Sequence, residues 1–193
     1  MRALVLYAHP VETSYNAALH AATVAALKAA GYEVDDCDLY AEKFDPVMSR
    51  QERIDYHDEA INTLPVQGYV DRLRAAEALV LCTPVWNYNY PAILKGFIDR
   101  VFVPGVSFKL VDGIVRPNLQ HIRKIACVTT YGGTRFRSFI MGDAPRKAFK
   151  RTLRVLVHPL AKAKYLALYD MNRNDEATLK AFLAKVSEEM HRF

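Results

Sequence analysis

The stretch from Thr83 to Tyr90, Thr-Pro-Val-Trp-Asn-Tyr-Asn-Tyr, brings aromatic rings and amide side chains together in one short segment. It follows the apolar run 78–82, which predicts a strand buried on both faces, and it precedes a helix predicted from Pro91 onward. Because such connections run over the surface, we expect the rings and amides to bind a flat ligand with polar edges. The competing interpretation, aromatics that only cover the core, is weakened by their concentration at the carboxyl end of a strand.

Two further loops carry groups suited to binding. The loop from His9 to Asn16 leads into an alanine-rich helix, and the free backbone N–H groups at a helix start form a phosphate site. Capping of that helix by Ser14 or Thr13 explains this loop equally well. In the third loop, 130–133, two glycines allow a ligand to approach the backbone because glycine lacks a Cβ and tolerates positive φ. Alone, this is a weak signal.

The elements that must position these loops alternate between strand and helix. We expect strands at about 3–8, 33–39, 78–82, 124–129 and 163–168, and helices at 14–30, 66–76, 91–102, 145–157 and 175–190. A capping box at Ser49 predicts a further short helix, and Asp112-Gly113 predicts a hairpin turn. The pattern predicts an α/β fold, a flavodoxin-like doubly wound five-stranded parallel sheet of order 2-1-3-4-5, in one domain over 1–193. That order brings the three loops to one edge.

Composition excludes several classes of protein. With 193 residues, half of them apolar, and a net charge of +5, the chain is expected to have one core. No segment reaches transmembrane length and no signal peptide is evident, so we expect a cytoplasmic protein without membrane insertion. The three widely spaced cysteines are expected to be buried free thiols, with no metal site. The basic run 146–154 is expected to be a solvated helix face, not a nucleic-acid site.

Together the loops offer a phosphate pocket, an aromatic-amide wall and a glycine wall, which favours a phosphorylated flat heteroaromatic ligand, with FMN as the leading candidate. The chain has no G-x-G-x-x-G or P-loop motif. A phosphoacceptor receiver domain needs clustered acidic residues after the first strand, where this chain has Tyr7-Ala8-His9. An α/β hydrolase needs a G-x-S-x-G elbow, which is absent.

Three sets of residues also resemble a known family. They are Ala8-His9-Pro10 with Ser14-Tyr15-Asn16, Pro84 with Pro91-Ala-Ile-Leu-Lys-Gly96 and Asp99-Arg-Val-Phe102, and Thr129-Thr130 with Gly132-Gly133. In this combination the chain resembles the flavodoxin-like NAD(P)H:quinone oxidoreductase family, which includes FMN-dependent azoreductases and quinone reductases that are ancillary subunits of potassium efflux systems. These motifs cover most of the first two thirds of the chain, and the last sixty or so residues match only in general pattern.

The resemblance implies FMN as cofactor, with FAD as the alternative, and NADH or NADPH as electron donor. It implies a ping-pong reduction of a quinone or another small aromatic acceptor by a homodimer. By resemblance the phosphate is held by Ser14, Tyr15 and Asn16, with His9 close by, and the ring lies between Pro84, Val85, Trp86, Asn87, Tyr88 and Thr130, Tyr131, Gly132, Gly133. Tyr131 or Tyr88 is expected on the substrate face. A flavodoxin-type electron carrier and a regulatory transporter subunit are the alternative functions.

For the donor, NADH and NADPH both stay open. Arg135 and Arg137 follow the third loop and are candidates for contact with a 2′-phosphate.

Overall fold

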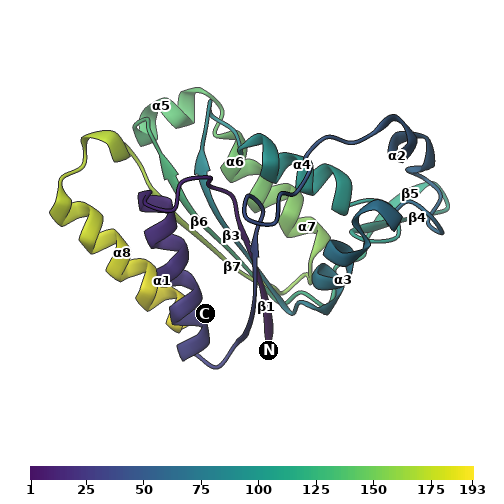
Figure 1. Ribbon diagram of the computed structural model, residues 1–193, viewed down its shortest axis with the longest axis horizontal. Helices are drawn as coiled ribbons and strands as arrows, with labels where there is room; N and C mark the ends of the chain where they lie inside the picture. Colours follow the sequence, from purple (N-terminus) through teal and green to yellow (C-terminus); the bar gives the residue numbers. More distant parts are fainter.

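The computed structural model describes residues 1–193 and contains a five-stranded parallel sheet at its centre (Figure 1). Its strands are β1 (Arg2–Tyr7), β2 (Glu33–Asp38), β3 (Ala78–Val85), β6 (Lys124–Tyr131) and β7 (Lys162–Leu168). They lie in the order β2-β1-β3-β6-β7. Counted along the sheet strands alone this is 2-1-3-4-5, so the predicted fold class and strand order are confirmed.

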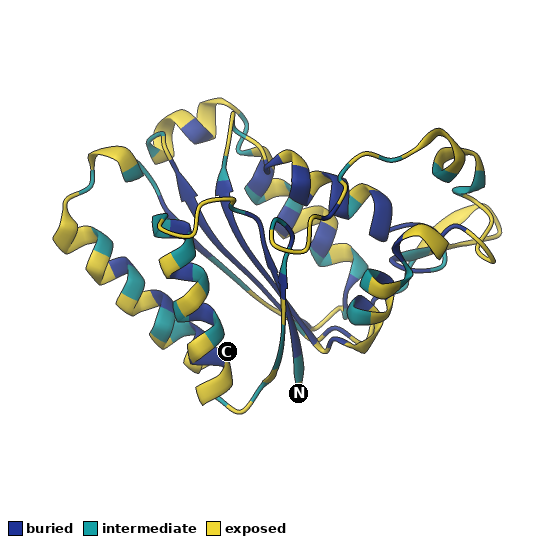
Figure 2. Cartoon of the chain, in the orientation of Figure 1, coloured by how far each residue is buried: buried dark blue, intermediate teal, exposed yellow.

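Helices cover both faces of the sheet (Figure 1). One face packs against α1 (Tyr15–Ala29) and α8 (Glu176–His191), and the other against α3 (Gln67–Ala75), α4 (Ala92–Val101) and the segment formed by α6 (Ala144–Lys147), η2 (Ala148–Leu153) and α7 (Arg154–Leu156). Successive strand residues point to opposite faces, so Leu4 and Leu6 join one apolar cluster while Ala3 and Val5 join the other. Strands β1, β3 and β6 are therefore buried almost throughout, whereas the edge strands β2 and β7 are partly exposed (Figure 2).

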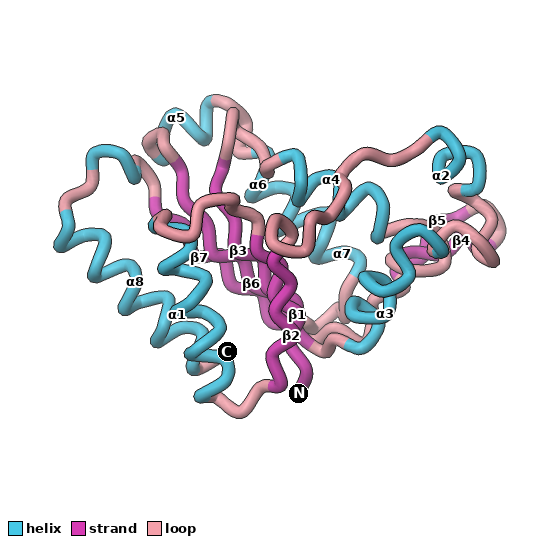
Figure 3. The backbone as a smooth tube through the Cα atoms, in the orientation of Figure 1, coloured by secondary structure: helices cyan, strands magenta, loops and turns pink.

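Short elements branch from this framework. Ser49 caps α2 (Arg50–Asp55) with the predicted capping box, and η1 (Leu64–Val66) leads into α3. The antiparallel pair β4 (Phe108–Val111) and β5 (Ile114–Pro117) forms the predicted hairpin, whose turn residues Asp112 and Gly113 both have positive φ. Figure 3 shows this hairpin at one end of the molecule, remote from α1 and α8.

Three features differ from the sequence prediction. Helix α5 (Arg135–Ile140) and the turn η3 (Met171–Arg173) were not predicted. The predicted helix over 145–157 is interrupted by the π-helical segment η2. Strands β3 and β6 continue to Val85 and Tyr131, so part of each predicted loop belongs to a strand.

The three cysteines are buried free thiols, as predicted. No helix is long and apolar enough to cross a membrane, and no group of three or more His, Cys, Asp and Glu side chains is arranged to hold a metal ion.

Candidate functional site

The three predicted loops meet at the carboxyl edge of β1, β3 and β6. The rings of His9 and Trp86 lie edge to face with centroids 5.7 Å apart. Asn16, which is buried, donates from Nδ2 to Thr130 Oγ1 at 2.9 Å. A Cβ built on Gly133 would lie 3.8 Å from the Tyr88 hydroxyl. Each loop therefore contacts another, and the edge of the sheet is a site at which side chains far apart in sequence come together.

The first loop ends in an open helix start. Ser14 is the N-cap of α1, and its hydroxyl accepts from the backbone N–H of Ala17 at 3.1 Å. The N–H groups of Tyr15 and Asn16 have no acceptor in the chain. Since α1 runs for 15 residues, its dipole adds positive potential at these two donors, and the arrangement fits a phosphate group.

Tyr15 contributes to this loop through its backbone. Its hydroxyl donates to the carbonyl of Leu179 on α8 at 2.7 Å, and burial raises the pKa of Tyr15 to about 12. The side chain therefore ties α1 to α8. Only the N–H of Tyr15 is left for the phosphate contact that the family resemblance implied.

The second loop is a tight turn under backbone strain. Trp86 and Asn89 exchange both backbone hydrogen bonds, at 3.0 and 2.9 Å, across Asn87 and Tyr88. Both central residues have positive φ, 48° for Asn87 and 59° for Tyr88; asparagine tolerates this conformation, whereas it costs a residue such as Tyr88 about 1–2 kcal/mol. The turn leaves Trp86 41% exposed. Such strain is typical of ligand sites.

The third loop presents backbone donors. The N–H groups of Gly132 and Gly133 have no acceptor in the chain. Neither glycine has positive φ. A Cβ on Gly132 would approach no atom closer than 3.4 Å, and on Gly133 none closer than 3.8 Å. The chain itself therefore does not require glycine here, whereas a ligand lying flat against the backbone would.

Tyr131, one of the two tyrosines expected on the substrate face, lines the cavity, but its hydroxyl is bound inside the chain. The side chain is 2% exposed, stacks on Tyr169, and donates to Asp143 Oδ1 at 2.8 Å. Its oxygen also lies 2.5 Å from that of Tyr165, and burial raises the pKa of Tyr131 well above its ordinary value. A hydroxyl held in this way positions the chain next to Gly132. Of the two predicted tyrosines, Tyr88 alone is partly exposed at the cavity.

Two adjoining cavities open at these loops. One, of about 210 Å³, is lined by Val85, Asn87, Tyr88, Tyr131, Gly132, Gly133 and Ser138. The other, of about 420 Å³, shares the two glycines and adds Thr134, Arg137, Asp170, Asn172 and Arg173. The sequence analysis missed Asp170 and Asn172. Both follow the carboxyl end of β7, so the strand-end rule that selected the other loops applies to them as well.

His9 and Pro84 lie beside these cavities. His9 Nδ1 accepts from the N–H of Val11 at 3.1 Å, which shapes the first loop, and the ring lines a separate polar cavity of about 510 Å³ beside the end of β2. Pro84 is buried within β3, opposite Thr130 of β6. Pro84 therefore anchors the start of the aromatic turn to the sheet.

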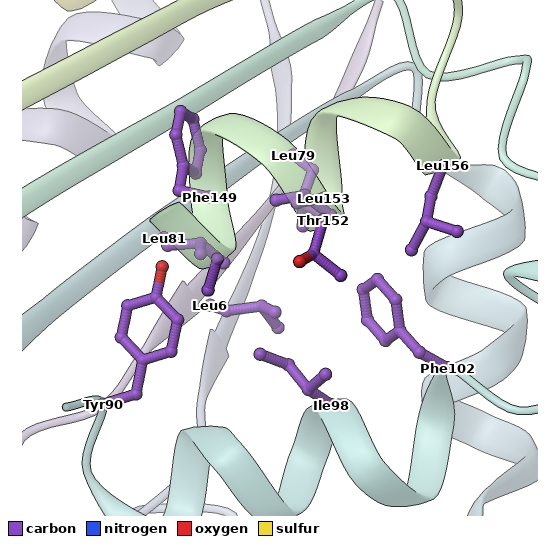
Figure 4. Close-up of a pocket in the computed structure, with 11 residues that line it drawn as sticks. Leu6, Leu79, Leu81, Tyr90, Ile98, Phe102, Phe149, Thr152, Leu153 and Leu156 are labelled. Carbon is purple, nitrogen blue, oxygen red and sulfur yellow. The ribbon is translucent and has the colours of Figure 1, made fainter. Parts of the chain in front are cut away.

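A different cavity lies away from these loops, between α4 and the η2–α7 segment (Figure 4). It has a volume of about 70 Å³, and its lining is apolar except for Thr152 and Tyr90, whose hydroxyl donates to the carbonyl of Pro145 at 2.8 Å. No group in it is suited to charge or proton transfer. We regard it as a gap in core packing.

Comparison with known proteins agrees with this geometry. A family model described as a flavodoxin-like fold matches residues 1–189. The NAD(P)H dehydrogenase [quinone] 1 of Rattus norvegicus is 31% identical over 147 residues, which cover 68% of this chain and 54% of that protein. An uncharacterized NAD(P)H oxidoreductase of Escherichia coli, YcaK, is 31% identical over 140 residues, which cover 72% and 68%. The chain thus spans about half the length of the rat relative.

Among solved structures, the Streptococcus mutans protein Smu.1420 superposes with a TM-score of 0.85 at 29% identity, with both chains covered completely. The NAD(P)H:quinone oxidoreductase of Methanothermobacter marburgensis superposes with a TM-score of 0.83 at 22% identity, over 99% of this chain and 98% of that one. The second likeness is one of fold.

Proposed function

The chain belongs to the flavodoxin-like fold family, and from this premise we propose that it is an FMN-dependent NAD(P)H:quinone oxidoreductase that acts as a single domain over 1–193. One observation carries the proposal: the open start of α1, the strained aromatic turn and the Gly132-Gly133 backbone converge on one edge of the sheet. The printed names of relatives, including the rat dehydrogenase, support the same activity. FAD is the alternative cofactor.

The residues present fit FMN in two places. The unpaired N–H groups of Tyr15 and Asn16 would hold its phosphate. The N–H groups of Gly132 and Gly133 would donate to the polar edge of its ring, where they would stabilise negative charge. When bound, FMN supplies two-electron hydride transfer between a nicotinamide and a quinone.

The substrates would bind in turn, because one exposed face serves both. Tyr88 lines the cavity beside Gly133, and Trp86 lies exposed at the start of the same turn. Their rings would orient a flat nicotinamide or quinone by stacking. Tyr131, with its hydroxyl bound to Asp143, would keep the glycine backbone in place and so act as a positioning residue.

We further propose a homodimer. The β4–β5 hairpin leaves four apolar side chains about half exposed, namely Leu110, Val111, Ile114 and Val115. The register puts Leu110 and Val115 on one face of the hairpin and Val111 and Ile114 on the other, and exposed apolar side chains of this kind are typical of interfaces. Size-exclusion chromatography with light scattering over a range of concentrations tests this, and a monomer at all of them would contradict it.

The activity is tested by spectroscopy. The purified chain, loaded with FMN, is mixed without oxygen with NADPH or NADH, and absorbance near the flavin band is followed. We expect rapid bleaching by the nicotinamide and recovery of the band when a benzoquinone is added. A flavodoxin-type carrier would hold FMN without being bleached by either nicotinamide. A chain that takes up neither FMN nor FAD would refute the proposal.

A further inference from the structure

A cavity lined by cations lies between α5 and the α6–η2 segment. It has a volume of about 350 Å³. Its lining contains Arg135, Arg146, Lys147, Lys150 and Arg151, with Phe139, Gly142 and Asp143 completing the wall. Five basic side chains and one carboxylate therefore face a common space, which gives it a strongly positive potential.

None of these five cations forms an ion pair, although they lie close together. Arg72 and Arg100, for comparison, are both bound to carboxylates, Arg72 to Asp35 and Arg100 to Glu52. The single acid of the cavity, Asp143, already accepts the Tyr131 hydroxyl. Asp143 therefore offsets one of the five positive charges, and a bound anion would offset part of the repulsion among the remaining ones.

The cavity is also held in shape. Arg146 donates from Nη1 to the Tyr169 hydroxyl at 3.2 Å, and its guanidinium lies 5.3 Å from the centre of the Tyr165 ring. Asp143 has positive φ, 45°, just before α6. An arginine oriented in advance loses less entropy when it binds a phosphate, whose oxygens match its planar fork.

The cavity adjoins the candidate flavin site through α5. Ser138 on this helix lines the cavity beside Tyr88 and Gly133, whereas Arg135 and Phe139 line the basic one. Because Ser138 and Phe139 are consecutive residues of α5 (Arg135–Ile140), the two cavities lie on either side of this short helix. Phe139, 78% exposed at the rim, offers a flat ring for an adenine base.

We propose that this cavity binds the 2′-phosphate of NADPH and so makes NADPH the preferred donor over NADH, an inference that rests on the proposed function. The 2′-phosphate is a compact anion with a charge of about −1.5 to −2, and NADH lacks it. A concave site suits such a group. A protein that binds nucleic acid or a membrane instead has cations spread along an outer face.

The test uses nucleotide fragments and does not depend on turnover. Adenosine 2′,5′-bisphosphate and 5′-AMP are titrated into the full FMN-loaded chain by calorimetry at low salt. We expect the bisphosphate to bind at least about tenfold more tightly, as one charge-assisted contact implies. In the double variant Lys147→Gln/Arg151→Gln this preference should fall by roughly tenfold or more, with FMN absorbance unchanged.

The matched control is Lys180→Gln/Arg192→Gln on α8, which removes the same charge from exposed side chains outside the cavity and should keep the preference. Equal binding of the two nucleotides to the unmodified chain would overturn the inference, as would a preference that survives in the cavity variant. Inorganic phosphate that competes as well as the bisphosphate would also overturn it, because the site would then bind free phosphate. A chain that binds the bisphosphate but takes up no flavin would refute the reductase and keep the cavity assignment.

Discussion

At Gly133 the effect of a substitution on ligand binding can be separated from its effect on folding. Its φ is not positive and a Cβ would meet nothing closer than 3.8 Å, so we expect Gly133→Val to fold normally. The two branches of valine would extend toward the Tyr88 hydroxyl into the proposed ring site. FMN affinity should therefore fall by about tenfold or more, since a contact of about 1.4 kcal/mol corresponds to that factor.

Fluorescence titration of FMN measures this effect, and thermal unfolding reports the fold. Gly68→Val on α3 is the matched control, because this glycine is exposed and nothing lies within 4 Å of its Cβ position. Unchanged FMN affinity in Gly133→Val would remove the glycine turn from the site.

Asp35 on β2 links three elements and sets a pH dependence. It is bound by Arg72 of α3 at 2.7 Å and by Arg2 of β1 at 2.9 Å. Burial would raise the pKa of its carboxyl, but the hydrogen bonds from the two arginines outweigh burial and hold the pKa below the ordinary 3.8. The unfolded state thus binds the proton more readily, so this contribution to stability is complete above about pH 4 and is lost as pH falls through the folded pKa.

For Asp35→Asn we expect a loss of about 1.5–3 kcal/mol in the free energy of unfolding at pH 7, the range for hydrogen bonds to charged groups. The difference from the unmodified chain should shrink below about pH 4. Urea unfolding at pH 7 and pH 3 measures both values. Glu188→Gln, which removes an exposed partner of Arg192, should change little at either pH. A deficit that stays constant down to pH 3 would contradict this account.

At the scale of elements, Gly96 shows why α4 contains a glycine inside the Pro91-Ala-Ile-Leu-Lys-Gly96 motif. A Cβ at this position would overlap the backbone oxygen and the side chain of Pro46. The segment carrying Pro46 is fixed to α4 a turn later, where Arg100 binds Glu52 at 2.7 Å and the carbonyl of Asp45. Glycine therefore lets the 41–64 excursion lie directly on α4.

We accordingly expect Gly96→Ala to destabilise the fold by about 1–3 kcal/mol, the cost of overpacking a filled contact, although alanine favours a helix. Chemical denaturation measures it. Gly68→Ala, in open space on α3, should instead be neutral or stabilising by up to about 1 kcal/mol. Equal effects of the two substitutions on the free energy of unfolding would mean that the segment carrying Pro46 can move away from α4 without loss of stability.

How far the elements could be predicted depends on which residues are buried. The central strands β3 and β6 were identified because their apolar runs are buried on both faces, and β2 was identified from its alternating pattern. Helix α5 was missed because Phe136, Phe139 and Ile140 are exposed and only Ser138 is buried, so no apolar stripe marks it. The direction of Tyr131 was missed because β6 runs two residues further than expected. In that extension, the side chain follows the alternation of the strand into the Tyr165 cluster.

At the scale of the whole molecule, the candidate site is formed by three loops that few noncovalent contacts hold together. The loops at 9–16, 83–90 and 130–135 belong to three strands, and the contacts between them include the Asn16–Thr130 hydrogen bond and the His9–Trp86 ring pair. A ligand held by all three loops would bind the folded state and not the unfolded state, so it would raise the free energy of unfolding. By linkage, FMN at about 100 times its Kd contributes about 2.7 kcal/mol.

For a chain of this length that energy corresponds to a rise of roughly 5–11 °C in Tm. Riboflavin at the same concentration, which lacks the phosphate, should raise Tm less, because the N–H groups at the start of α1 would have no anion to bind. Differential scanning calorimetry measures both shifts, with inorganic phosphate alone as the control. Equal shifts from FMN and riboflavin would show that α1 does not hold the phosphate. The absence of any shift with FMN would mean that the three loops do not together form a flavin site.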